Sequence, residues 1–339
     1  MVKSARKIAV MGSGAWGTAL AHLLASRHPN VYQWVRERDV EAAINEQHEN
    51  TRFLPGVALH PGIVASRDPE RVLAGADLVV NVIPTQYIRP TWTEIGVDAL
   101  PSDAIVVNAS KGIEQESLYL VSQIFDDLFP SWISSRFCVL SGPSFADEVV
   151  RGLPTSVALA APRESIGRDV AEILHLPHFR VYTTLDLMGV QLGGALKNVI
   201  AIAAGAVDGM NLGNNTRAAV ITRGLAEMAR LGARMGAHTQ TFFGLSGLGD
   251  LVLTTTGALS RNRTVGLRIG AGESLDDILR SMQSVAEGVP TAKSAFMLAQ
   301  RHQVDMPITQ AVYDGLYLSQ KPQEALWSIL SRSLKADGI

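Results

Sequence analysis

The feature that most constrains this chain is a glycine pattern directly after an apolar run near the N-terminus. Residues 8–11 have the composition of a buried strand, they lead into Gly12, Gly14 and Gly17, and residues 15–26 have a helical pattern. In such a unit the first glycine permits a tight turn, the second lets the backbone approach a pyrophosphate, and the third lets the helix pack on the strand. The helix N-terminus then offers backbone N–H groups to phosphates. The flanking strand and helix therefore predict a dinucleotide-binding turn, rather than an ordinary glycine-rich connection.

Length and composition limit the class of protein. The chain has 339 residues, enough for two domains, because one domain spans roughly 100–200 residues. A hydrophobic fraction of 47% suits a well-filled core, and a net charge of −2 gives no general attraction for nucleic acid or a membrane surface. Cys138 is the only cysteine, and it lies in the apolar run 137–140. We expect it to be a core residue of a cytoplasmic chain without disulfides and without a targeting segment.

The pattern of apolar residues changes near residue 185. Before it, strand-like and helix-like segments alternate, with a helix predicted over 117–128 and further strands predicted at 31–35, 63–66, 78–83, 104–108, 139–140 and 156–160. After it, only helical patterns remain, at 189–207, 216–235, 275–283, 291–301 and 308–317. Alternation of this kind is typical of a parallel, doubly wound α/β sheet. We therefore expect a Rossmann-type domain over 1–186 and an all-helical domain over 187–339.

Lys197 is the only charged residue in the apolar segment 187–207. The segment is rich in glycine and alanine, and a charge at its centre is costly in lipid, so we interpret it as a buried helix rather than a membrane span. A buried ammonium is unfavourable unless it is paired or used, and desolvation lowers its pKa toward the range of proton transfer. The alternative is a lysine that extends from a helix end to solvent.

Several polar residues follow predicted strands, where ligands of such sheets bind. Lys111 follows the strand at 104–108, and Gly142 and Ser144 follow the strand at 139–140. Arg36 follows the second strand, at the place where NAD-binding chains usually carry an acid. A guanidinium there can grip a 2′-phosphate or stack on adenine. Glu37 beside it leaves NAD open as well.

Two further segments in the helical half carry polar groups. Asp250 directly follows the glycine-rich stretch 243–249. It is a candidate site residue, and the alternative is that it only caps a helix. Ser260, Arg261 and Asn262 place hydroxyl, guanidinium and amide donors in a row, which suits a phosphate; the alternative is a generic basic turn. The sequence shows no cluster with the spacing of a metal site, so we expect none.

Taken together, these segments make the chain resemble the bacterial NAD(P)-dependent sn-glycerol-3-phosphate dehydrogenase family. The matching pieces stand in the right order at 12–20, 110–114, 140–146, 196–198, 247–251 and 259–263. The chain departs from the pattern at 254–257, where relatives often carry a cysteine. The resemblance implies reduction of dihydroxyacetone phosphate to sn-glycerol 3-phosphate by NADPH or NADH, which supplies phospholipid synthesis.

The resemblance also implies roles for single residues. Lys197 is similar to the family's proton donor. The implied substrate contacts are Lys111, Gly142, Ser144, Asp250, Ser260, Arg261 and Asn262. The implied cofactor contacts, beside the glycines Gly12, Gly14 and Gly17, are Ser13, Trp16, Arg36, Lys111, Ala146, Arg261, Val285 and Glu287.

Two other functions stay open at this point. One is a two-domain dehydrogenase of β-hydroxy acids, against which the phosphate donors at 260–262 argue. The other is a non-catalytic dinucleotide sensor, against which the joint presence of Lys197, Lys111 and Asp250 argues. We expect a small phosphorylated substrate as partner and a homodimer, without nucleic acid or membrane insertion.

Overall fold

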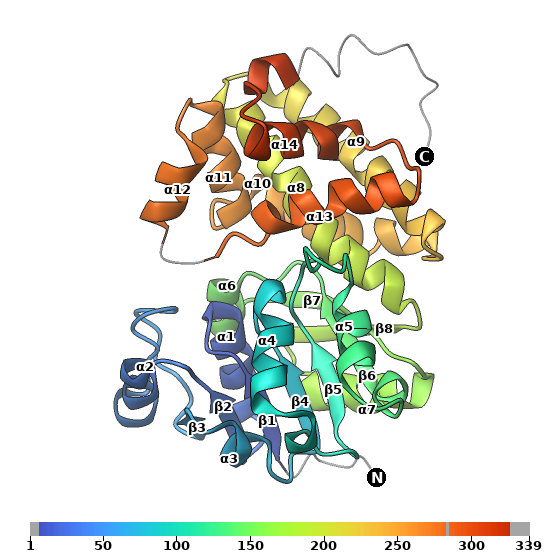
Figure 1. The fold of residues 1–339 in the computed structure, drawn as a ribbon. Coiled ribbons are helices and arrows are strands. Elements are labelled where there is room, and N and C mark those ends of the chain that lie inside the picture. The colour runs from blue at the N-terminus through green and yellow to red at the C-terminus, as the bar shows by residue number, and fades with distance from the viewer. Residues whose placement is uncertain (1–6, 283–284, 326–339) are drawn as a thin grey trace. The chain divides into compact units, whose positions relative to one another are not determined.

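The computed structural model describes residues 7–282 and 285–325, and the chain divides into two compact units (Figure 1). The first unit comprises Met1–Ser110 and Val121–Leu187, and the second comprises Lys111–Leu120 and Met188–Ile339. The short segment Lys111–Leu120 is held in the second unit by the Ser294 hydroxyl, which donates a hydrogen bond to the Ile113 carbonyl at 3.1 Å. Lys111 therefore lies in the same unit as Lys197.

The first unit is built on one twisted sheet, in which the described residues form eight strands. Their bounds are β1 Ile8–Met11, β2 Val31–Trp34, β3 Ile63–Ser66, β4 Leu78–Asn81, β5 Ile105–Asn108, β6 Phe137–Ser141, β7 Thr155–Ala160 and β8 Phe179–Thr184. The strand order is β3-β2-β1-β4-β5-β6-β7-β8, and Ile8 pairs with Val31 on one side and with Leu78 on the other. The predicted doubly wound, Rossmann-type sheet is confirmed. Its order reverses between β1 and β4, the place where such sheets bind ligands.

The prediction of a wholly parallel sheet is wrong for one pair of strands, because β6 and β7 run antiparallel. The connection between them contains only the short helix α6 Ala146–Val150. A helix of this length does not lead the chain back along the sheet, as a parallel connection requires. The chain therefore returns in the opposite direction, and β8 then pairs parallel with β7 at the edge.

Helices cover both faces of this sheet. They are α1 Ala15–Ala25, α2 Arg38–Ala42, α3 Pro69–Leu73, α4 Thr85–Ile95, α5 Val121–Leu128, α6 and α7 Glu164–Leu174. Side chains alternate along β6, so that Cys138 joins the core shared with α1 and α7, while Phe137 contacts Phe125 of α5. Helix α5 begins later than the predicted residue 117, because Leu118 has a φ of +63° and interrupts the helix.

The described residues of the second unit form helices and loops, without a strand. Its helices are α8 Leu187–Gly209, α9 Gly213–Arg234, α10 Asp250–Thr256, α11 Arg261–Gly270, α12 Leu275–Ser281, α13 Gly288–Arg301 and α14 Pro307–Tyr317. The five predicted helical patterns correspond to α8, α9, α12, α13 and α14, although the last residue of the third pattern, residue 283, lies outside the described residues. The sequence patterns do not predict α10 and α11, because both helices are short and neither has a long apolar face.

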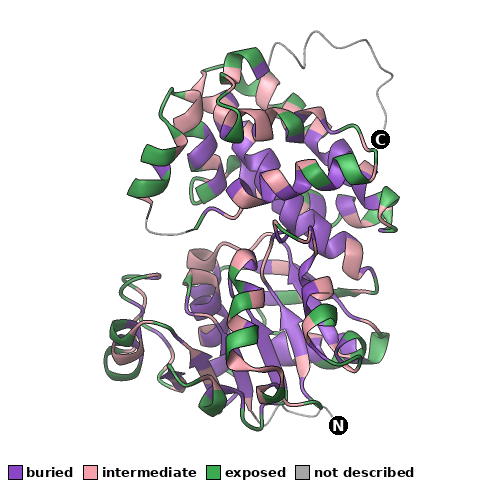
Figure 2. Ribbon diagram, viewed as in Figure 1, coloured by how far each residue is buried: buried purple, intermediate pink, exposed green. Residues whose placement is uncertain are grey.

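Helix α8 is the central element of this unit. By length and composition it is apolar enough to cross a membrane, but 89% of its most apolar window is buried inside the protein. Figure 2 shows this burial along most of the helix. Such burial is typical of a core helix, and it explains how Lys197 comes to lie in an apolar environment.

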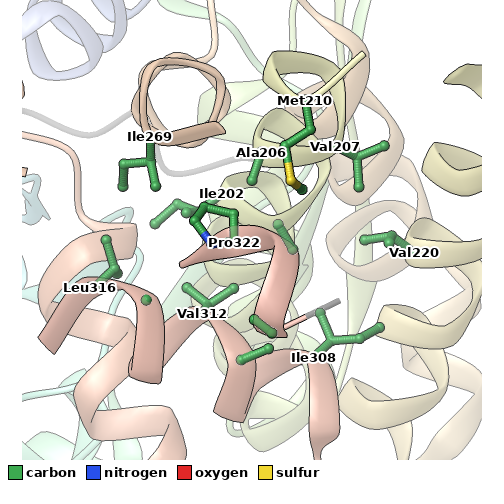
Figure 3. Close-up of a pocket in the computed structure, with 14 residues that line it drawn as sticks. Ile202, Ala206, Val207, Met210, Val220, Ile269, Ile308, Val312, Leu316 and Pro322 are labelled. Carbon is green, nitrogen blue, oxygen red and sulfur yellow. The ribbon is translucent and has the colours of Figure 1, made fainter. Parts of the chain in front are cut away.

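An apolar pocket opens beside the C-terminal half of α8 (Figure 3). Its lining residues are Ile202, Ala203, Ala206, Val207, Met210, Val220, Ile269, Ile308, Ala311, Val312, Gly315, Leu316, Pro322 and Ala325. None of these side chains offers a positive charge or a hydrogen-bond donor. The pocket therefore lacks the groups that a phosphorylated substrate needs.

Glu227 of α9 is a buried carboxylate that holds the N-terminus of α14. It accepts hydrogen bonds from the Ile308 N–H at 2.7 Å and from the Thr309 N–H and hydroxyl at 3.1 and 3.0 Å. Burial raises the pKa of Glu227 to about 7, and the hydrogen bonds from Ile308 and Thr309 limit the rise. The folded chain thus binds this proton more tightly than the unfolded chain.

This raised pKa predicts a stability that depends on pH. The contribution of Glu227 to the free energy of unfolding is greatest below its ordinary pKa of 4.5 and is lost as the pH rises to about 7. The loss corresponds to roughly 3 kcal/mol. We expect Glu227→Gln to remove this part of the pH dependence, as measured by urea unfolding at several pH values. If the free energy of unfolding depends on pH equally in both proteins, the Glu227 carboxylate does not titrate in this range.

Candidate functional site

The glycine turn after β1 has the geometry that dinucleotide binding requires. Gly12 has a φ of +126°, which favours glycine, and a Cβ on Gly17 would lie 2.3 Å from the Gly12 carbonyl oxygen. A Cβ on Gly14 would meet nothing within 4 Å, so the backbone there faces open space. Gly14 is also the N-cap residue of α1, and no side chain caps this helix end. The first N–H groups of α1 are therefore available for a phosphate.

Side chains of the first unit hold this turn in place. The Ser13 carbonyl accepts hydrogen bonds from Asn50 Nδ2 at 2.8 Å and from the Thr18 hydroxyl at 3.2 Å. Gln33 Nε2 donates to the Gly12 carbonyl at 3.1 Å. The indole N–H of Trp16 is buried and has no hydrogen-bond partner among the described residues. A polar group left in this way beside an open glycine turn fits a site for a polar ligand.

Arg36 lies where β2 ends, and its side chain is exposed. Its carbonyl accepts a hydrogen bond at 3.1 Å from Nε of Arg67, which follows β3. The ends of two neighbouring strands thus carry one guanidinium each. Arg67 is not among the predicted site residues, although its position just after β3 is the same signal that identified Arg36.

Gly142, Ser144 and Ala146 lie in a second loop of the first unit. Gly142 has a φ of +145°, and a Cβ on it would lie 3.0 Å from the Cα of Val157. The Ser144 hydroxyl donates to the Gly142 carbonyl at 3.0 Å, and Ala146 begins α6. The loop therefore follows β6 at the carboxyl edge of the sheet, as the sequence predicted from its position.

The second unit brings two lysines onto one carboxylate. Nζ of Lys197 lies 2.7 Å from Oδ1 of Asp250, and Nζ of Lys111 lies 2.6 Å from Oδ2 of the same residue. Asp250 has only 1% of its side chain exposed, whereas Lys197 has 8% and Lys111 17%. The three residues come from α8, the start of α10 and the segment after β5. One buried carboxylate thus orients two ammonium groups.

Thr254 completes this cluster. Its hydroxyl oxygen accepts a hydrogen bond from Lys197 Nζ at 2.7 Å, and the hydroxyl donates to the Asp250 carbonyl at 2.6 Å. Thr254 is not among the predicted site residues, and residues 254–257 stand out in the sequence only as a departure from the family pattern. The available signal was the spacing, because residues four positions apart share one face of a helix and Thr254 follows Asp250 by four.

The electrostatics of the cluster suit proton transfer. Burial lowers the pKa of Lys197 to about 8; the Asp250 carboxylate opposes this shift, whereas the positive charges of Lys111 and Arg261 add to it. For Asp250, burial acts to raise the pKa, but the two lysines outweigh it and lower the pKa below its ordinary value. At neutral pH the arrangement is therefore a protonated Lys197 held by an ionised Asp250.

The N-terminus of α11 carries the predicted phosphate donors. Ser260 is its N-cap residue, and its hydroxyl oxygen accepts a hydrogen bond from the Arg263 N–H at 3.2 Å. Arg261 is exposed, and its charge acts on Lys197. Ser260 and Arg261 are thus placed at a helix end that favours anions.

Asn262 has a different environment from the one its sequence position suggested. Its Oδ1 accepts a hydrogen bond from the Gly288 N–H at 2.9 Å, and its Nδ2 donates to Asn198 Oδ1 at 2.9 Å. Both ends of the amide therefore have partners inside the protein. The Ser260 hydroxyl caps the Arg263 N–H, so the first N–H groups of α11, those of Arg261 and Asn262, have no acceptor within the helix.

The last two predicted residues lie just before α13. Val285 is exposed, and Glu287 is the N-cap residue of that helix. The Glu287 carboxylate interacts electrostatically with the Arg261 guanidinium. Glu287 and Arg261, both implied as cofactor contacts, are therefore neighbours in the second unit.

Comparison with known proteins identifies the family of this chain. The model of the NAD-dependent glycerol-3-phosphate dehydrogenase N-terminus matches residues 7–166, and the model of its C-terminus matches residues 186–327. The chain belongs to the NAD-dependent glycerol-3-phosphate dehydrogenase family. The predicted resemblance is therefore confirmed.

Relatives of this family match the whole chain. A glycerol-3-phosphate dehydrogenase [NAD(P)+] of Geobacter sp. (strain M21) is 48% identical over 99% of this chain and 100% of the relative. One from Solidesulfovibrio magneticus is 50% identical over 97% of this chain and 99% of the relative. The crystal structure of a glycerol-3-phosphate dehydrogenase from Coxiella burnetii is 36% identical, with a TM-score of 0.89, over 96% of this chain and 99% of that chain.

The residues to which the resemblance to glycerol-3-phosphate dehydrogenases assigns a role are distributed over both units. The second unit brings together Lys111, Lys197, Asp250 and Arg261 through the contacts and charges described above. The first unit contains the glycine turn with Ser13 and Trp16, and also Arg36, Gly142, Ser144 and Ala146. The implied substrate contacts Gly142 and Ser144 thus lie in the first unit, and the implied cofactor contacts Val285 and Glu287 lie in the second.

Proposed function

We propose that this chain catalyses the reduction of dihydroxyacetone phosphate to sn-glycerol 3-phosphate with NADPH or NADH, and that Lys197 is the proton donor. The observation that carries the proposal is the buried pair of Lys197 and Asp250, with Lys111 on the second oxygen of the carboxylate. The product supplies glycerophospholipid synthesis. Residues 1–186 hold the dinucleotide, and residues 187–339 bind the substrate.

The chemistry assigned to Lys197 follows from its hydrogen bonds. An ammonium has three N–H donors, and Asp250 and Thr254 accept two of them. The third is left for the carbonyl oxygen of the substrate. Bound NAD(P)H supplies a hydride to the carbonyl carbon, and negative charge then develops on the carbonyl oxygen. Lys197 stabilises this charge and donates the proton, and Asp250 keeps the resulting amine in place.

The substrate phosphate requires local cations, because the chain carries a net charge of −2. Lys111 and Arg261 supply them, together with the N–H groups at the N-terminus of α11 and the hydroxyl of Ser260. Lys111, Lys197 and Arg261 outnumber the carboxylates of Asp250 and Glu287, so the site keeps a positive excess that suits a dianion. This balance favours a phosphorylated substrate over a β-hydroxy acid, and the paired catalytic lysine favours an enzyme over a sensor.

The direct test is a spectrophotometric assay of the purified chain with dihydroxyacetone phosphate, using NADPH and NADH in parallel. We expect oxidation of the cofactor that depends on the phosphorylated substrate, and little turnover of dihydroxyacetone. Equal rates with both substrates, or no rate with either, would refute the proposal.

Arg261→Ala is expected to raise the KM for dihydroxyacetone phosphate and to lower kcat/KM by about 10- to 50-fold, because a bound phosphate also orients the carbonyl. The same change should barely alter the low activity on dihydroxyacetone. Affinity for NAD(P)H must be measured separately by fluorescence, because Arg261 also neighbours Glu287. An equal loss on both substrates would remove Arg261 from the phosphate site.

Arg36→Asp is expected to lower kcat/KM for NADPH about tenfold more than for NADH, through a lost ion pair and a new like-charge repulsion. Arg67→Gln is a useful companion variant, since its guanidinium hydrogen-bonds to the Arg36 carbonyl. We expect it to change the same ratio in the same direction, but less. If Arg36→Asp leaves the NADPH to NADH ratio unchanged, Arg36 does not face the 2′ position.

The remaining cofactor contacts are proposed in the same way. Gly12, Gly14 and Gly17 with Ser13 and Trp16 bind the pyrophosphate, and the groups that complete the two sites are Gly142, Ser144, Ala146, Val285, Glu287 and the backbone of Asn262. We further propose that the chain acts in the cytoplasm as a homodimer, without membrane insertion or a nucleic-acid partner.

A further inference from the structure

Helices α8 and α11 touch backbone to backbone, through glycines on both. A Cβ on Gly205 of α8 would lie 2.1 Å from the Arg263 carbonyl oxygen, and a Cβ on Gly209 would lie 2.1 Å from that of Leu267. In return, a Cβ on Gly266 of α11 would lie 1.9 Å from the Ile202 carbonyl oxygen. No side chain separates the helices at these points, so α11 has one register along α8.

An ion pair holds the same register from the side. Nε and Nη2 of Arg263 lie 3.1 and 2.6 Å from Oδ2 of Asp208, and Nη1 of Arg217 lies 3.0 Å from Oδ1. The Asp208 side chain is 14% exposed and that of Arg263 is 20% exposed, so the pair is largely shielded from solvent. Arg263 thus contacts α8 at two points. Its carbonyl packs against Gly205, and its guanidinium pairs with Asp208.

The register matters because both helices carry groups of the substrate site. Helix α8 holds Lys197, and α11 begins with Arg261, two residues before Arg263. The Asn262 amide, which donates to Asn198, joins the helices once more directly beside Lys197. The distance from the proton donor to the phosphate donors is therefore set by how α11 is fixed along α8.

We infer that Asp208 and Arg263 are positioning residues, which set the spacing between Lys197 and the phosphate-binding end of α11. The inference rests on the proposed function. Neither residue contacts the reacting atoms. Their effect depends on a substrate that reaches both Lys197 and the phosphate-binding end of α11, because only such a ligand is affected by the spacing between them. Inorganic phosphate and dihydroxyacetone each occupy one end alone.

The test uses Asp208→Asn, Arg263→Gln and the double variant in the full-length chain. We expect each to lower kcat/KM for dihydroxyacetone phosphate about tenfold, since small misplacements of a bound substrate cost this much or more. The double variant should be no worse than Asp208→Asn alone, because that change already removes the pair with Arg263. Inhibition by inorganic phosphate, the rate with dihydroxyacetone and the Kd of NADPH should stay unchanged.

Glu273→Gln is the matched control, because it removes the pair of Arg268 on α11 with Glu273, which does not involve α8. It should leave kcat/KM unchanged.

If Arg263→Gln does not fold, as judged by thermal melting, Arg263→Lys keeps the charge without the forked geometry and should show part of the same loss. Unchanged kcat/KM in folded variants would overturn the inference, as would a parallel loss on dihydroxyacetone or a parallel weakening of phosphate inhibition. Absence of activity in the parent chain would instead refute the proposed function.

Discussion

Replacing Lys197 by alanine is expected to lower kcat for reduction of dihydroxyacetone phosphate by at least about 10²-fold, the range of general acid catalysis. The Lys197 side chain is 8% exposed, and its ammonium is oriented by Asp250 and Thr254, so the site offers an ordered proton donor that water does not replace. The measurement is steady-state kinetics with NADPH at saturating substrate.

Binding of NADPH provides the control for this variant. The glycine turn with Gly12, Gly14 and Gly17 lies in the other unit, so the Kd of NADPH should change little. Thr254→Val serves as the milder companion, because it removes one acceptor from Lys197 without changing charge. We expect its loss to be much smaller. A folded Lys197→Ala variant with near-normal kcat would exclude Lys197 as the proton donor.

Asp250→Asn is expected to lower the rate of reduction at neutral pH by about 10²-fold and to shift its pH profile. In the parent, the pKa of Lys197 is about 8, so reduction should slow as the pH rises through that value and the donor loses its proton. The opposite holds for oxidation of glycerol 3-phosphate, which needs the neutral amine. Without the carboxylate, Lys197 faces Lys111 and Arg261 with no counter-charge, and its pKa falls further. The alkaline limb should therefore move to lower pH.

Folding must be checked for this variant, because breaking a buried pair costs about 3–5 kcal/mol when a charge is left without a partner. Thermal melting gives this control, and the position of the alkaline limb does not depend on the amount of folded protein. If that limb stays at the parent value in Asp250→Asn, the carboxylate does not set the protonation of Lys197.

Much of the first unit follows from local sequence. An apolar run, a glycine turn and a helical pattern determine β1, the turn and α1, because the strand, turn and helix form from residues close together in the chain. The same holds for α8, where one lysine in a long apolar segment indicated both a buried helix and a proton donor. Long, strongly periodic segments such as these carry their own signal.

Short or irregular elements were less predictable. Helix α10 is short and follows a glycine-rich stretch, and α11 has a polar sequence that is equally typical of a loop. The reversal of direction between β6 and β7 depends on the short connection that contains α6. In each case packing against neighbours, rather than intrinsic preference, selects the structure.

The sequence by itself determined the doubly wound sheet, the dinucleotide turn and the candidate proton donor, since each is written in contiguous residues. Only the tertiary structure decided that Asp250 joins Lys111 to Lys197, and that the Asn262 amide forms hydrogen bonds with Asn198 and Gly288. These contacts link residues that lie tens of positions apart or more. Charge pairing and buried hydrogen bonds act through space, so their partners become known only when the chain is folded.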